Sequence, residues 1–241
     1  MFKEIKMSIL TFSMLTSSVL AIEITSPTHA VDIAGKQRMF TQRMLKDYAM
    51  VGMGNTFGNP KEDLEKIIDS FQDYMESLAG YAKNDDTKKS LEKVSSLWLA
   101  LKKTLLEKPS KDKVEKLQVD LEALLKASND TTKFFAKESG NKSGEIVNKS
   151  GRQRMLSQRM ASLYMLKVWE VKDPQFKIKL NSTMKLFKDS LEELSKSELN
   201  TDEINKLLAK VKRSFMFFEM MGKSESKFVP SLIYKNQMIF L

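Results

Sequence analysis

An eleven-residue segment occurs twice in the chain, 116 positions apart, and this repeat restricts the fold more than any other feature of the sequence. Residues 34–44 read AGKQRMFTQRM and residues 150–160 read SGRQRMLSQRM, so seven of the eleven positions are identical. The same offset relates apolar and acidic positions further along the chain, for example Phe71 to Phe187 and Glu76 to Glu192. A repeat of this extent is typical of a fold built from two similar units.

Apolar residues recur at intervals of three and four along nearly all of the chain after residue 30, and this spacing predicts amphipathic helices. Clusters of Gly, Pro, Asn and Asp divide the chain into seven expected helices, which cover residues 25–56, 60–82, 86–107, 110–138, 143–171, 174–197 and 201–225. No stretch alternates as a strand would. We therefore expect an all-α fold, an antiparallel bundle of about seven helices built from the two repeats.

The amino-acid composition excludes several classes of chemistry. Cysteine is absent and His29 is the single histidine. Disulfides, zinc sites of the Cys/His kind and catalysis by these residues are therefore excluded. The chain also has no HExxH, nucleophile-elbow or phosphate-loop motif. We expect neither an enzyme nor a bound metal or cofactor.

The amino terminus has the pattern of a secretory signal peptide. Lys3 and Lys6 precede an apolar run, and Val19 and Ala21 provide small residues before the expected cleavage site. The run is shorter than the roughly 20 residues of a transmembrane helix, and an uncleaved anchor is the alternative. We expect export to the periplasm. The predicted divisions are a signal peptide over residues 1–21, the first repeat with a connecting helix over 22–138, and the second repeat over 139–241.

The chain is basic, with 40 Lys+Arg against 31 Asp+Glu and a formal net charge of +9. The basic residues alternate with acidic ones, which is typical of solvated helix faces. Because export separates the protein from nucleic acid, we do not expect nucleic acid as a partner. A weak attraction to anions or to a negatively charged membrane surface remains open.

The repeated motif places unusual residues on one helical face. Steps of three and four along a helix align Gly35, Arg38 and Gln42 in the first copy, and Gly151, Arg154 and Gln158 in the second. Glycine in a helix costs about 1 kcal/mol relative to alanine, which is compatible with the close approach of another helix or a ligand. A buried arginine needs an anionic partner, and neither motif contains an acid.

Two interpretations of the motif arginines stay open. A small planar anion bound between Arg38 and Arg154 would match the planar guanidinium groups, with Gln42, Gln158, Thr41 and Ser157 supplying neutral donors or shape. Alternatively, each arginine pairs with an acid from another helix and only holds the bundle together. The remaining basic residues of the motifs lie on other faces and are expected to be exposed or structural: Lys36, Arg43, Arg152 and Arg159. The motif methionines are expected to fill the core.

The two motif copies resemble the P-box of the PilJ-type ligand-binding domain family, whose usual form is similar to N-x-A-G-R-Q-R-M-L-S-Q-R-M. That family covers exported sensor domains of type IV pili chemotaxis transducers, and it is similar to the nitrate/nitrite sensor domains of NarX-type histidine kinases. Residues 150–160 are close to this form, whereas Lys36 and Phe40 replace the usual Arg and Leu. Asp32 and Asn148 stand where Asn is common.

This resemblance implies recognition of nitrate or nitrite. In the nitrate-sensor relatives, the arginine before the first methionine of the motif binds the anion between two facing helices, and its equivalents here are Arg38 and Arg154. The motif glycines are Gly35 and Gly151. Because one chain carries both motifs, we expect one molecule to form a pseudo-symmetric site, with a homodimer as the alternative.

No signalling coiled coil, kinase or methyl-accepting region follows the second repeat. We therefore expect an exported binding protein that senses the anion and presents the signal to a separate membrane receptor or transporter. The alternative is a structural helical module that binds a protein partner in envelope or pilus-linked signalling, without a small ligand.

Overall fold

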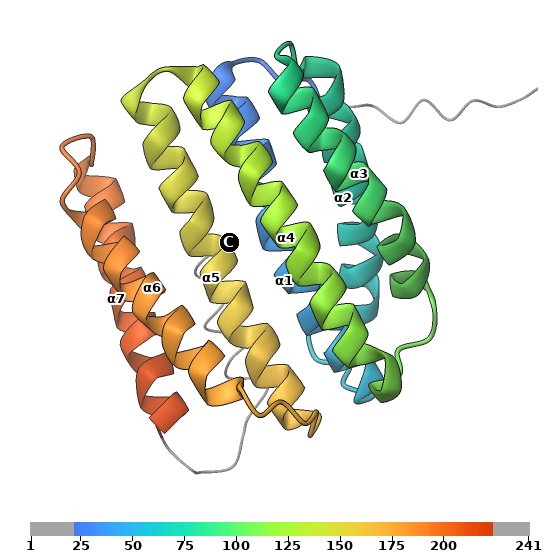
Figure 1. The fold of residues 1–241 in the computed structure, drawn as a ribbon. Helices are drawn as coiled ribbons and strands as arrows, with labels where there is room; N and C mark the ends of the chain where they lie inside the picture. Colours follow the sequence, from blue (N-terminus) through green and yellow to red (C-terminus); the bar gives the residue numbers. More distant parts are fainter. Residues whose placement is uncertain (1–21, 224–241) are drawn as a thin grey trace, which may run out of the picture.

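The computed structural model describes residues 22–223, and within that range the chain folds into seven helices joined by loops (Figure 1). The helices are α1 (Pro27–Gly52), α2 (Pro60–Tyr81), α3 (Asp85–Leu106), α4 (Lys111–Ser139), α5 (Lys142–Val168), α6 (Phe176–Ser195) and α7 (Asp202–Lys223). The prediction of an all-α bundle of about seven helices is therefore confirmed. The predicted signal peptide, residues 1–21, lies outside the described residues. Among residues 22–223, no helix has the combination of length and apolar character that crossing a bilayer requires.

Local residue chemistry sets the limits of the helices. The Ser26 side chain caps α1 by accepting a hydrogen bond from the His29 N–H, at 3.1 Å. Helix α1 ends earlier than predicted, before Gly54, which has a φ of 69° that favours glycine. Helix α6 begins at residue 176, two residues after the predicted start at 174. In the turn that precedes it, the Asp173 carboxylate accepts a hydrogen bond from the Gln175 N–H at 2.9 Å.

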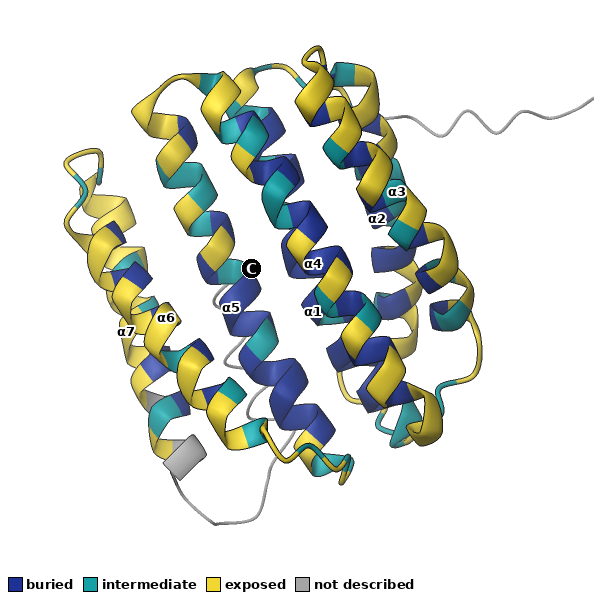
Figure 2. Ribbon diagram, in the orientation of Figure 1, coloured by how far each residue is buried: buried dark blue, intermediate teal, exposed yellow. Residues whose placement is uncertain are grey.

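Helix α1 is the central helix of the bundle and packs against α2, α4 and α5. All residues from Gln37 to Gln42 are buried, so α1 is covered on several sides and not on a single face. By contrast, α6 and α7 lie at the edge and are exposed over much of their length (Figure 2). The first motif is therefore at the centre of the protein, where its polar side chains need internal partners.

The two repeats have unequal surroundings. Helices α1, α2 and α3 correspond to α5, α6 and α7, and α4 packs on both α1 and α3. No helix of the described chain takes the place of α4 beside α5 and α7. The loop before α7 has one extra residue, so the offset between α3 and α7 is 117, and Ile204 is the counterpart of Thr87. Thr87 is fully buried, whereas Ile204 is 39% exposed. Equivalent sequence positions therefore differ in burial because α4 belongs to one repeat only.

Candidate functional site

Helices α1 and α5 cross at the two motif glycines. A methyl group at Gly151 would lie 3.6 Å from the Cα of Gly35, an ordinary van der Waals contact, so packing of the backbones would tolerate alanine. The same methyl group would lie only 3.0 Å from Nη2 of Arg38 and 3.8 Å from Nη2 of Arg154. The glycine therefore keeps open a space that borders both guanidinium groups.

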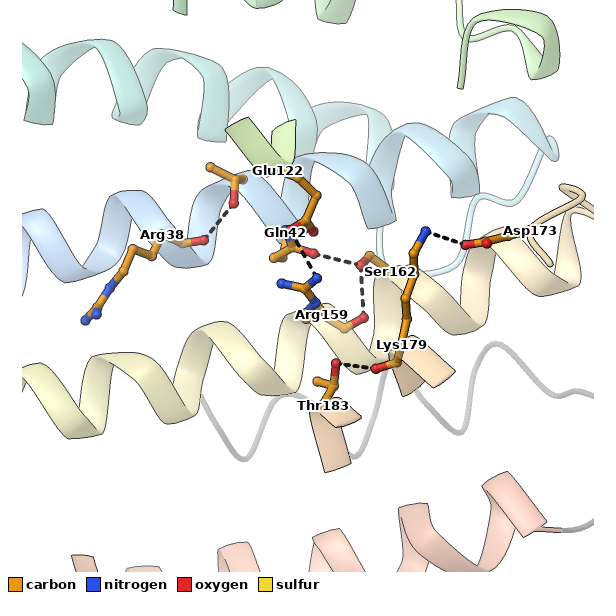
Figure 3. Close-up of polar contacts among 9 residues, drawn as sticks. Arg38, Gln42, Glu122, Arg159, Ser162, Asp173, Lys179 and Thr183 are labelled. Carbon is orange, nitrogen blue, oxygen red and sulfur yellow. Dashed lines mark hydrogen bonds and ion pairs between the residues drawn. The ribbon is translucent and has the colours of Figure 1, made fainter. Parts of the chain in front are cut away.

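The Arg38 side chain extends from α1 towards α5 and is 1% exposed (Figure 3). Its Nη1 donates to the Oδ1 of Asn129 on α4 at 3.1 Å, and its Nη2 donates to the backbone carbonyl of Asn148 on α5 at 3.0 Å. Its Nε has no hydrogen-bond partner, and no carboxylate within residues 22–223 pairs with this guanidinium. Arg38 is thus a buried cation with two neutral acceptors.

The electrostatic surroundings of Arg38 are unfavourable for a cation. Burial, together with the positive charges of Arg152 and Arg154, lowers the pKa of Arg38 to about 10. The side chain still keeps its proton at neutral pH. A buried charge without an opposite charge lowers the stability of the folded protein. An anion beside Arg38 would therefore reduce this electrostatic cost.

Arg154 reaches the same crossing but has a carboxylate partner. Its Nη2 lies 2.6 Å from Oδ1 of Asp32 on α1, and its side chain is 23% exposed. The other Asp32 oxygen lies 3.0 Å from Nζ of Lys36. One of the two interpretations was that each motif arginine pairs with an acid from another helix. This is true of Arg154 and not of Arg38.

The contacts of the two arginines are related by the repeat. Asp32 and Asn148 are equivalent positions, 116 residues apart. Arg154 contacts the Asp32 carboxylate, and Arg38 contacts the Asn148 backbone carbonyl. Asp32 was not predicted from the sequence as a partner of Arg154. The sequence did contain a signal for this contact: Asp32 lies three residues before Gly35, and this spacing places the two residues on one helical face.

The motif glutamines also differ. Gln42 donates to Glu122 of α4 at 3.2 Å and accepts from Ser162 of α5 at 3.2 Å (Figure 3). Gln158 is fully buried, and neither polar atom of its side chain has a hydrogen-bond partner in the described part of the protein. Gln37, which the sequence analysis did not select, is likewise buried with both atoms unpartnered. Gln42 thus joins three helices, whereas Gln158 retains unused hydrogen-bonding capacity.

Two of the four other basic residues of the motifs connect one helix to another. Arg43 pairs with Asp63 of α2, and Arg159 lies 3.0 Å from Glu122 of α4. Arg152 is exposed and has no ion pair among residues 22–223. The described residues contain no group of three or more His, Asp or Glu side chains that is able to hold a metal ion.

Fold and site together define a two-repeat helical bundle in which a buried arginine lies at the crossing of two equivalent helices. The family model PilJ, described as type IV pili methyl-accepting chemotaxis transducer N-term, matches residues 23–127 and 135–215. These ranges include both motif copies and most of the helical bundle, and the chain belongs to this family. No curated protein and no solved structure matches the chain significantly.

Proposed function

We propose that the protein binds a small planar oxyanion, nitrate or nitrite, between Arg38 and Arg154. The observation that carries this proposal is the buried Arg38 guanidinium, which has neutral acceptors only and an unpartnered Nε. A bound monoanion would compensate this charge and accept charge-assisted hydrogen bonds, which are stronger than neutral ones. Membership in a family of chemotaxis transducer domains supports a sensory role.

The shape of the crossing favours a flat ligand. Beside Gly35 and Gly151 the two backbones approach to near contact, and Nη2 of Arg38 lies against both glycines. A guanidinium group is planar and presents its donors in one plane, so a planar anion beside it satisfies several donors while remaining thin. A tetrahedral dianion such as sulfate is thicker and carries a larger desolvation cost.

We further propose that residues 1–21 direct export to the periplasm, and that the anion-bound form signals to a separate membrane receptor or transporter. The family description, the N-terminal part of a transducer, supports a sensor that acts through another component. Assembly as a homodimer is compatible with this role, but the proposed site needs only one chain.

The alternative function is a structural helical module without a small ligand. The Arg154–Asp32 ion pair favours it, because that pair alone explains why Arg154 is at the crossing. A module of this kind would show no specific response to anions.

A comparison of anions at constant ionic strength separates the two functions. We expect nitrate and nitrite to raise the melting temperature, by roughly 5–10 °C at a hundred times Kd for a protein of this size. Sulfate and chloride should act no more than as general salts. A uniform response to all anions, or a larger shift with sulfate than with nitrate, would contradict nitrate recognition.

Replacement of Asp32 tests whether the carboxylate competes with the anion. We expect Asp32→Asn to strengthen nitrate binding about fivefold, because it frees Arg154 from an ion pair of the partly exposed kind that is worth up to about 1 kcal/mol. Isothermal titration calorimetry measures the change.

Asp120→Asn is the matched control, because it removes a carboxylate that pairs with Lys116 on the exposed side of α4. It should leave the nitrate affinity unchanged. Weaker nitrate binding by Asp32→Asn would show that Asp32 positions Arg154 for the anion and would refute competition.

A further inference from the structure

A pocket with a volume of about 440 Å³ lies between α4, α5 and α6, separate from the glycine crossing. Its walls come from one face of α4, one face of α5 and the first half of α6. Asn129, which accepts a hydrogen bond from Arg38, is also among its lining residues. The pocket is far larger than a nitrate ion, and it lies within the range of about 300–1,000 Å³ that is typical of small-molecule sites.

The charged residues of the pocket are mainly basic. Four cations line it, Lys126, Lys133, Arg152 and Arg159, against one acid, Glu122. Glu122 lies 3.0 Å from Arg159, so these two charges compensate each other. Lys133 lies 3.4 Å from the exposed Asp130, a weak surface pair.

Lys126 and Arg152 are the uncompensated cations of the pocket. Neither has an ion pair within the part of the chain that the structure describes. Arg152 is also close enough to Arg38 for the two positive charges to repel each other. Two helices thus present unpaired cations to the same pocket, which favours an anionic group between them.

The rest of the lining is apolar. Leu125, Met155 and Leu156 are buried beneath the pocket, and Leu186 of α6 is 41% exposed at its edge. An exposed leucine beside buried apolar side chains offers a surface for a hydrocarbon group. The pocket therefore combines an anion-binding end with an apolar surface.

We propose that this pocket binds an organic anion that has an oxyanionic head group and an apolar body. The head group lies at Lys126 and Arg152, and the body covers Leu156 and Leu186. This site is distinct from the proposed nitrate site, since its lining does not include Arg38, Gly35 or Gly151, but the two are adjacent because Asn129 lines the pocket and accepts from Arg38.

Anilinonaphthalene sulfonate, a sulfonate with an aromatic body, is a suitable probe because its fluorescence rises on binding. We expect the wild-type protein to bind it, and Lys126→Gln/Arg152→Gln to weaken binding about tenfold or more through loss of charge-assisted contacts. Leu186→Gln should lower the affinity through loss of apolar contact. Phenylnaphthylamine, which has the apolar body without the sulfonate, should bind weakly and not respond to Arg152→Gln.

Two controls make the test specific. Lys188→Gln/Lys212→Gln removes two cations from a pocket of about 420 Å³ between α6 and α7 that also contains apolar residues, and it should leave probe binding unchanged. Asp120→Asn, which changes a surface charge of α4 outside the pocket lining, should also leave it unchanged. All altered side chains of the two double variants are exposed, and circular dichroism melting checks their fold. Equal binding by the wild type and Lys126→Gln/Arg152→Gln, or an equal loss in both double variants, would overturn the proposal.

Discussion

Arg38→Met is expected to abolish the nitrate response while leaving the ligand-free protein as stable as the wild type or more stable. Charge-assisted hydrogen bonds contribute roughly 1.5–3 kcal/mol each, so loss of the guanidinium should weaken nitrate binding about a hundredfold. In the ligand-free protein the change replaces a buried cation, which lacks a carboxylate partner, with an apolar side chain of similar length. Calorimetric titration and melting curves, with and without nitrate, measure both effects.

Arg213→Met is the matched control for this prediction. Arg213 is exposed on α7, so its replacement removes the same charge from the surface and should change neither nitrate binding nor stability appreciably. A structural role for Arg38 predicts the reverse result. In that case Arg38→Met would lower the stability by about 3–5 kcal/mol, and the wild type would not respond to nitrate.

Gly151→Ala is expected to separate anion binding from stability. The new methyl group would enter the space beside both guanidinium groups, 3.0 Å from Arg38 Nη2. We expect nitrate affinity to fall about tenfold or more, the equivalent of about one hydrogen bond to a charged group. The stability should stay the same or rise by up to about 1 kcal/mol, because alanine has the higher helix propensity and the Gly35 backbone leaves room for it.

Gly80→Ala gives the same gain in helix propensity at a position of α2 where a methyl group meets no atom within 4 Å. It should therefore raise the stability without changing nitrate affinity. Unchanged nitrate binding by Gly151→Ala would show that the space beside the glycine is not used by the anion.

The helices were predictable because their signals are local. Apolar spacing and turn residues indicated all seven elements, and most limits differ by a few residues only. The central position of α1 was not predictable, because two of the helices that cover it, α4 and α5, come from distant parts of the chain. Buried polar residues such as Gln37 were missed for this reason: periodicity describes one face of a helix and not the number of neighbours around it.

The equivalence of the two arginines in the candidate site was predictable from the sequence, but their different surroundings were not. Repeat identity indicated that Arg38 and Arg154 are equivalent, and the structure brings both side chains to Gly151. Their different environments depend on tertiary neighbours that the motif does not contain. Asn129 comes from α4, which belongs to one repeat only, and Asp32 precedes the motif.

Because α1 and α5 belong to one chain, the two sides of their crossing carry different residues, and the crossing forms without association of subunits. In a symmetric homodimer both sides of an interface carry the same residues, so a carboxylate at the position of Asp32 would occur twice and would be available to both arginines. Here the position equivalent to Asp32 in the second repeat is Asn148, so one arginine remains without a carboxylate. Because both helices are covalently linked, formation of the crossing requires no association step, and the fraction of sites occupied by ligand would depend on the anion concentration and not on the amount of protein present.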